Sequence, residues 1–138
     1  MATDERQRLI AAVGRHSPGE IAEEQGLSRA AVALIFTPSS QGFELCMIRR
    51  SEHPQDPWSG HMAFPGGRHE PEDSSSLATA IRETREEIGV VLPHDSFVGP
   101  LSPLRVPVRV SNRAMVIEPF VFCLDKQMEP APNEEVAG

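Results

Sequence analysis

The feature that most constrains this sequence is a short amphipathic segment near its middle, residues 76–88. Apolar or small side chains recur on one side of it at helical spacing, at Leu77, Ile81, Thr84 and Ile88. Asp73 and the serines 74–76 offer N-caps at its start, and Gly89 is typical of a C-terminal stop. The pattern predicts a helix whose apolar side faces a core.

The same segment carries three glutamates, Glu83, Glu86 and Glu87, at positions i, i+3 and i+4. At about 100° per residue they share an arc of about 100°, away from the apolar side. Like charges at this spacing destabilise an isolated helix by roughly 0.2–0.5 kcal/mol per pair, and the helix dipole disfavours acids near the C-terminal end. A divalent cation would reverse both effects, because clustered carboxylate oxygens suit Mg²⁺ or Mn²⁺. Taken alone, the pattern also fits a solvated acidic face.

A glycine pair precedes this helix, in the run Phe64-Pro65-Gly66-Gly67. Glycine opens backbone conformations closed to other residues and allows close approach to a ligand. A loop of this kind followed by a helix places exposed backbone groups beside the carboxylates. The combination favours a ligand site over a plain acidic surface.

Gly67 and the run from Arg82 to Val90 together resemble the Nudix box. The second half of that motif is matched by Arg82, Glu83, Glu86, Glu87, Gly89 and Val90. The first half departs from it, because Gly67 lies one residue further from Arg82 than usual and Ser74 stands where a glutamate is expected. Asp73 is the nearest acid, and a one-residue bulge in the loop would let it pair with Arg82.

The resemblance implies an α/β fold, a Nudix-type α/β/α sandwich around a mixed β-sheet. It implies a single domain over residues 1–138, with an N-terminal helical segment over about 1–28 and the box loop and helix over 66–90. The family usually adds another strand and a helix after a loop like residues 133–136. The chain is therefore expected to be either a minimal version or a C-terminally truncated fragment.

The resemblance also implies metal-dependent hydrolysis of a pyrophosphate bond, with Mg²⁺ or Mn²⁺ as cofactor. The family's metal ligands fall on Glu83, Glu86 and Glu87, together with a backbone carbonyl near Gly66 or Gly67. Arg82 is then an orienting ion-pair residue of the catalytic set.

A carboxylate must take the proton of the attacking water. Glu87 is one interpretation. The other is Glu134 or Glu135, since the family often supplies a glutamate from a later loop. Both of these residues also fit a solvated polar tail.

The substrate class is indicated by a second stretch of sequence. Arg50-Ser51 and the run from Gly60 to Gly67 resemble the extra signature of coenzyme A pyrophosphatases, although Gln55 stands where an arginine is usual. We expect a small-molecule nucleotide pyrophosphate, with coenzyme A or a derivative preferred and ADP-ribose or a dinucleotide as alternatives. The expected substrate contacts are Arg50, Gly66 and Trp58, whose ring suits stacking on adenine.

A different class of function rests on residues 21–32, which have helix-turn-helix spacing. Ser28-Arg29 would open the recognition helix of a DNA-binding regulator with a Nudix-like sensing domain. The formal charge of −7 leaves no basic footprint for nucleic acid. A Nudix fold that binds without catalysis is the third class, and the intact set of Arg82 and three glutamates argues against it.

Further predictions concern location and assembly. No apolar run reaches the ~20 residues of a membrane span, and the polar start does not resemble a signal peptide. Cys46 and Cys123 lie far apart without a CxxC spacing, which favours free thiols in a reducing cytoplasmic compartment. We expect neither a nucleic-acid nor a membrane partner. Many relatives dimerise, so a homodimer is one expected assembly.

The remaining elements follow from periodicity and turn residues. Helices are predicted over residues 4–14 and 18–26, and a hairpin with strands over 31–37 and 43–49. Further strands are predicted over 104–110 and 114–124, with Pro119 at an edge or a bulge of the latter.

Overall fold

The computed structural model describes residues 2–20, 27–52, 54, 60–107, 114–133 and 136. In chain order these residues form α1 (Ala2–Arg15), β1 (Ser28–Ser39), β2 (Gly42–Leu45), β3 (Ile48–Arg49), β4 (Met62–Ala63), β5 (Gly66–Arg68), α2 (Ser76–Ile88), the 3-10 turn η1 (His94–Ser96), β6 (Phe97–Pro100), β7 (Leu104–Pro107) and β8 (Ala114–Cys123).

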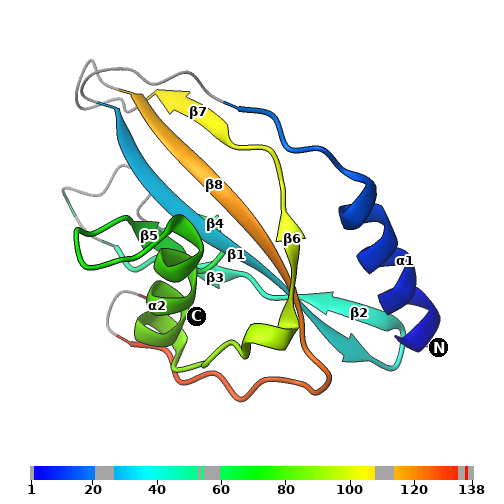
Figure 1. Ribbon diagram of the computed structural model, residues 1–138. Coiled ribbons are helices and arrows are strands. Elements are labelled where there is room, and N and C mark those ends of the chain that lie inside the picture. Colours follow the sequence, from blue (N-terminus) through cyan, green and yellow to red (C-terminus); the bar gives the residue numbers. More distant parts are fainter. Residues whose placement is uncertain are drawn as a thin grey trace.

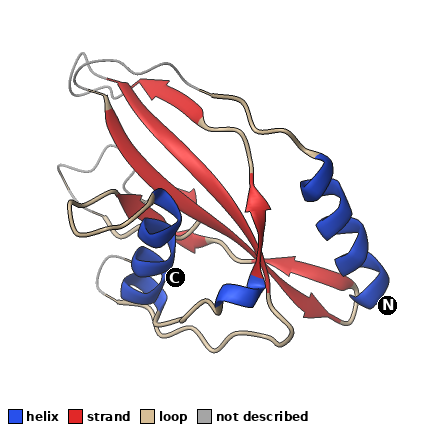
Figure 2. Cartoon of the chain, viewed as in Figure 1, coloured by secondary structure: helices blue, strands red, loops and turns tan. Residues whose placement is uncertain are grey.

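A mixed sheet is built on the two long strands β1 and β8, which run parallel to each other. β2 and β5 pair antiparallel with β1, while β6 and β7 pair antiparallel with β8. β3 and β4 form a separate two-stranded sheet. Helices α1 and α2 lie on opposite sides of the two long strands (Figures 1 and 2), which confirms the predicted α/β/α arrangement.

The core on the α2 side explains why this helix is held firmly. Ala31, Ala33 and Ile35 alternate along β1, are completely buried, and belong to one cluster with Ala80 of α2 and Phe122 of β8. Full burial of a side chain such as Ile35 stabilises the fold by about 1.5–3 kcal/mol. The small alanines of β1 let α2 lie close to the sheet, so the carboxylates of the helix are carried on a rigid element.

Both ends of the helix predicted over 76–88 are confirmed. The side chain of Ser75 accepts a hydrogen bond from the Ala78 N–H at 3.1 Å and caps the N-terminus. Gly89 ends the helix with a φ of 71°, and its N–H donates to the Arg85 carbonyl. This left-handed conformation strains any residue with a Cβ, which explains the glycine.

The prediction for the N-terminal region is confirmed in part. The helix expected over residues 4–14 is α1. Residues 18–20 are not helical, so the second predicted helix is wrong there, and residues 21–26 lie outside the described part of the chain. In the described ranges, neither α1 nor α2 has the length and apolar character required to cross a bilayer.

The predicted DNA-recognition helix is contradicted. Residues 28–32 are strand, and they pair with β8 on one side while 30–32 pair with β5 on the other. A segment with both edges hydrogen-bonded in a sheet cannot enter a DNA groove as a helix.

The hairpin prediction is correct at its turn and wrong in the length of its second strand. β2 ends at Leu45, and the Cys46 N–H still donates to the Ile35 carbonyl at 3.0 Å. Beyond this point residues 65–68 occupy the same edge of β1, because the Ala33 N–H donates to the Pro65 carbonyl at 2.8 Å and β5 follows. The chain therefore leaves the sheet, and β3 pairs with β4 instead.

The prediction for Pro119 is confirmed in part: the residue is not on an edge strand, but it lies where the pairing of β8 is irregular, between Pro100↔Phe120 of β6 and Leu104↔Ile117 of β7. This residue lies inside β8, which has neighbours on both sides. Its carbonyl accepts from the Leu101 N–H at 3.0 Å, in the gap between β6 and β7. The N–H and carbonyl of one strand residue point to the same side, so the donor that proline lacks faces this gap rather than a paired strand. Of the strand expected over 104–110, residues 104–107 form β7 and 108–110 lie outside the described residues.

Candidate functional site

The three glutamates of α2 do not share one exposed face. The side chain of Glu86 is 53% exposed and that of Glu83 is 14% exposed, while Glu87 is only 1% exposed. The buried side of the helix is rotated from its predicted position, since it includes Thr79, Ala80 and Glu87, while Leu77 and Ile81 are only partly buried. Burial thus rises across the arc of carboxylates, because one edge of the arc packs against β5.

Glu87 is buried because it binds the backbone of the glycine loop. Its Oε1 accepts a hydrogen bond from the Gly66 N–H at 2.8 Å. A Cβ at Gly66 would lie 2.2 Å from the Ala31 carbonyl oxygen, and one at Gly67 would lie 2.4 Å from the Glu83 Cδ. Gly66 is therefore required by the close approach of β5 to the backbone of β1, whereas a Cβ at Gly67 would displace the side chain of Glu83.

The predicted pairing of Asp73 with Arg82 is confirmed. Arg82 donates from Nε to Asp73 Oδ1 at 2.8 Å and from Nη2 to Oδ2 at 3.0 Å. Its Nη1 donates to Glu83 at 2.9 Å and to Glu86 at 3.1 Å. One guanidinium thus contacts the loop acid and two of the helix carboxylates at once, an arrangement that fits the predicted orienting role of Arg82, which stays a prediction.

Two further donors, from Glu70 and Thr79, complete the environment of Asp73. The Glu70 N–H and the Thr79 hydroxyl donate to its Oδ2 at 2.9 and 2.8 Å. The hydrogen bonds from Arg82 above all hold the pKa of Asp73 well below its usual range, and the same pair raises the pKa of Arg82. Thr79 also bonds His69 at 2.9 Å. The sequence offered no signal for Thr79, a buried polar residue within the helical pattern.

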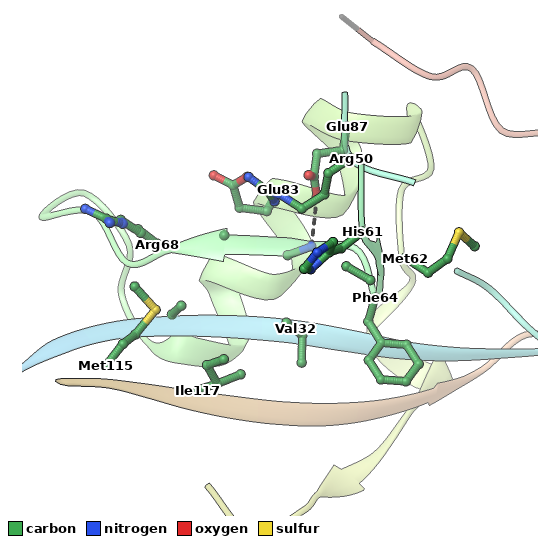
Figure 3. A pocket seen from close by; sticks show the side chains of 14 residues that line it. Val32, Arg50, His61, Met62, Phe64, Arg68, Glu83, Glu87, Met115 and Ile117 are labelled. Carbon is green, nitrogen blue, oxygen red and sulfur yellow. Dashed lines mark hydrogen bonds between the residues drawn. The ribbon is translucent and has the colours of Figure 1, made fainter. Parts of the chain in front are cut away.

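A pocket of about 440 Å³ opens beside the carboxylates of Glu83 and Glu87 (Figure 3). Glu83, Glu87 and the predicted substrate contact Arg50 line it together with Gly66 and Gly67. Its other wall is largely apolar, made by Ala30, Val32, Met62, Phe64, Met115 and Ile117. The pocket therefore combines an acidic and cationic side with an apolar floor on β1 and β8.

Not every predicted site residue can be placed. Trp58, Glu134 and Glu135 lie outside the described residues. Glu86 lies on the solvent side of the Arg82 cluster and does not line the pocket with Glu83 and Glu87.

The sequence analysis did not predict Met115 and Ile117 as pocket residues, although strict alternation along β8 identifies them as one face of that strand.

The donor set fits a hard divalent cation in its chemistry. Glu83, Glu86 and Glu87 offer only oxygen, on successive turns of one helix, and Gly67 brings a backbone segment directly against Glu83. No three His, Cys, Asp or Glu side chains in the described ranges converge closely enough to enclose an ion. The carboxylates are instead directed by Arg82 and by the Gly66 N–H.

Comparison with known proteins agrees with this geometry. A family model described as NUDIX domain matches residues 26–138. The uncharacterised Nudix hydrolase NudL of Yersinia enterocolitica is 30% identical over 122 residues, which are 88% of this chain and 58% of that protein. The mitochondrial coenzyme A diphosphatase NUDT8 of Mus musculus is 34% identical over 86 residues, which are 56% of this chain and 38% of that protein. The chain thus spans less than two thirds of either relative.

Among solved structures, the NUDIX domain of Shewanella oneidensis NrtR complexed with ADP ribose has a similar fold. The TM-score is 0.65 at 20% sequence identity, over 92% of this chain and 77% of that one. At this identity the likeness concerns the fold alone.

Proposed function

The chain belongs to the Nudix family, and from this premise we propose that it hydrolyses a pyrophosphate bond in a nucleoside diphosphate-linked substrate, preferably coenzyme A or a derivative. The observation that carries the proposal is the shared pocket of Glu83, Glu87, Arg50 and the glycine loop. Cation-binding carboxylates from α2, a guanidinium from the end of β3 and the glycines of β5 therefore line the same cavity.

Nudix hydrolases generally use divalent metal ions, and we assign this role here to Mg²⁺ or Mn²⁺. Glu83, Glu86 and Glu87 would hold the cation, with a carbonyl of the loop at Gly66 or Gly67. When bound, such an ion screens the charge of the phosphates and lowers the pKa of an attacking water.

The chain's own residues then supply orientation and proton transfer. Arg50, whose side chain lies beside Glu83 and Glu87 in the pocket (Figure 3), binds a phosphate oxygen, since a guanidinium matches phosphate geometry. Glu87 takes the proton of the attacking water, and its hydrogen bond from Gly66 holds the carboxylate in one direction. Arg82 keeps Glu83 and Glu86 aimed through its contacts to both. Glu134 or Glu135 remains the alternative general base predicted from the sequence.

Three observations support coenzyme A over other conjugates. Arg50-Ser51 and the run from Gly60 to Gly67 resemble the signature of coenzyme A pyrophosphatases in part, and the mouse relative is a coenzyme A diphosphatase. The apolar floor formed by residues such as Val32, Met115 and Ile117 also suits the uncharged pantetheine arm better than an additional charged group. ADP-ribose is the second candidate, because the bound NrtR domain shares this fold.

The cytoplasmic location, the lack of nucleic-acid and membrane partners, and the homodimer stay predictions from the sequence.

Product analysis by mass spectrometry tests the proposal. The purified chain is incubated with coenzyme A, ADP-ribose, NADH or a dinucleoside polyphosphate, in the presence of Mg²⁺, Mn²⁺ or EDTA. We expect metal-dependent release of 4′-phosphopantetheine and adenosine 3′,5′-bisphosphate. Cleavage of ADP-ribose alone would contradict the coenzyme A preference, and no cleavage by the folded chain would contradict the proposed activity.

A variant separates Glu87 from the alternative base. Glu87→Gln is expected to lower kcat about 10³-fold or more, because it removes a proton acceptor while retaining an oxygen for the Gly66 N–H. Glu72→Gln, an exposed glutamate of the preceding loop, is the matched control and should keep normal activity. A small effect of Glu87→Gln with a large effect of Glu135→Gln would transfer the role to Glu135.

A further inference from the structure

A C-terminal strap, defined as the described residues Ala131–Asn133 and Val136, crosses the end of α2. Helix α2 leaves its last four carbonyls without partners inside the helix. The carbonyl of Arg85 accepts from the Gly89 N–H at 2.9 Å. The strap supplies the donors for the three that remain, at Glu86, Glu87 and Ile88.

Asn133 provides two of these three hydrogen bonds. Its side-chain Nδ2 donates to the Glu86 carbonyl at 2.8 Å, and its backbone N–H donates to the Glu87 carbonyl at 2.8 Å. The Ala131 N–H donates to the Ile88 carbonyl at 2.6 Å. The two residues held by Asn133 are two of the three carboxylates assigned to the metal and the proton transfer.

The other end of the strap reaches Arg50, which also lines the pocket. Val136 forms an isolated antiparallel bridge with Arg50. Its side chain is 8% exposed and packs in one buried cluster with Ile48 of β3 and Ile88 of α2. β3 and β4 belong to a separate two-stranded sheet, so their strand pairing does not tie them to α2. The strap therefore connects the helix that carries Glu87 to the strand end that carries Arg50.

We propose that Asn133 is a positioning residue of the pyrophosphatase site. It fixes the last turn of α2, and hence the directions of Glu86 and Glu87, relative to Arg50. A displacement of about 1 Å at reacting groups can lower a rate about 100-fold, so loss of one such anchor is measurable in turnover. This inference rests on the proposed function and adds a residue to it.

The test compares Asn133→Ala and Asn133→Asp with a matched control. Asn133→Ala removes the side-chain donor and keeps the backbone N–H. Asn133→Asp keeps the shape, removes the donor, and places a negative charge at a helix C-terminus, where the dipole disfavours it. Gln127→Ala is the control, because Gln127 also donates from a side-chain amide to a backbone carbonyl, that of Pro38 at 3.2 Å, away from the pocket.

We expect Asn133→Ala to lower kcat about 10-fold and to raise the Mg²⁺ concentration for half-maximal activity about 10-fold, with KM changed less than about 3-fold. Asn133→Asp should be affected at least as strongly. Gln127→Ala should stay within about 2-fold of the unchanged chain in each quantity.

A second readout does not need turnover. The rise in melting temperature on adding Mg²⁺ or Mn²⁺ is measured for each protein, and it should be smaller for both Asn133 variants than for the unchanged chain and Gln127→Ala. Normal kcat and a normal metal response in folded Asn133→Ala, with only a lower melting temperature, would overturn the proposal in favour of a plain helix cap. If the unchanged chain cleaves no diphosphate, the proposed function fails, while the metal response still decides whether Asn133 directs the carboxylates. If Asn133→Ala does not fold, Asn133→Ser serves in its place for both readouts.

Discussion

Replacement of Asp73 by alanine tests the central electrostatic claim about the loop before α2. The Asp73 carboxylate accepts two hydrogen bonds from Arg82 and one each from Glu70 and Thr79. Its side chain is 4% exposed and that of Arg82 is 23% exposed. Removing one partner of a buried ion pair costs about 3–5 kcal/mol. Because Arg82 is partly solvated and retains Glu83 and Glu86, we expect a smaller loss, about 2–4 kcal/mol of unfolding free energy.

Urea denaturation measures this loss, and the chain contains a matched control. Asp125 forms an ion pair with Arg6, but its side chain is 76% exposed, so Asp125→Ala should cost less than about 1 kcal/mol. Equal losses for the two variants would refute the claim that burial and multiple donors make Asp73 important.

The pH dependence gives an independent check of sign. The pKa of Asp73 is lowered in the folded chain, so its contribution is fully present above the ordinary aspartate pKa of about 4. The contribution is lost as the pH falls toward the lowered folded pKa. The difference in stability between the unchanged chain and Asp73→Ala should therefore shrink when denaturation is repeated from pH 6 down to pH 2.5. A difference that grows on acidification would contradict this linkage.

Catalysis should change along with stability. Without Asp73, the guanidinium of Arg82 is left to Glu83 and Glu86 and competes with a cation for them. We expect the metal concentration for half-maximal activity to rise about 10–100-fold in Asp73→Ala, which is the usual effect of losing a residue that orients metal ligands through a hydrogen bond.

Two further predictions concern the glycine loop and the metal. Gly67→Ala should lower activity about 10-fold or more, because its Cβ would lie 2.4 Å from the Glu83 Cδ. Gly14→Ala is the control and should leave activity unchanged, because a Cβ there would have no atom within 4 Å. Equal activities of the two variants would contradict the close approach of Gly67 to Glu83. Mg²⁺ or Mn²⁺ at about 100 times its Kd should raise the unfolding free energy of the chain by about 2.7 kcal/mol, measured by thermal unfolding. Glu83→Gln should reduce this stabilisation by the metal. An equal stabilisation in the variant would show that Glu83 is not a metal ligand.

Much of the local structure around the site could be predicted from the sequence. The helix over 76–88 depends on spacing and on caps within a few residues of its ends, so Ser75 and Gly89 act where turn chemistry predicts them. The pairing of Asp73 with Arg82 also spans only nine residues. Interactions of this range are set mainly by helix geometry, which the sequence states directly.

Two of the failed predictions concern competition for a partner elsewhere in the chain. The strand expected over 43–49 ends at Leu45, because residues 65–68 occupy the edge of β1 beyond that point. The expected DNA-binding helix became strand because β8 and β5 satisfy its backbone from both sides. Propensity and spacing describe a segment alone, and they carry no information on which edge another segment has already filled.

The sequence by itself determined that three glutamates stand on one arc of a helix, with glycines before it and a stop after it. Only the tertiary structure decided that Glu87 turns inward to the Gly66 N–H, 21 residues away, and that Asn133 binds the Glu86 carbonyl from 47 residues away. The physical reason is that three glutamates that are equivalent in sequence take different roles, depending on which side of the helix is buried. That side is chosen by packing against β1 and β5 and by the donors that the distant chain brings to the helix end.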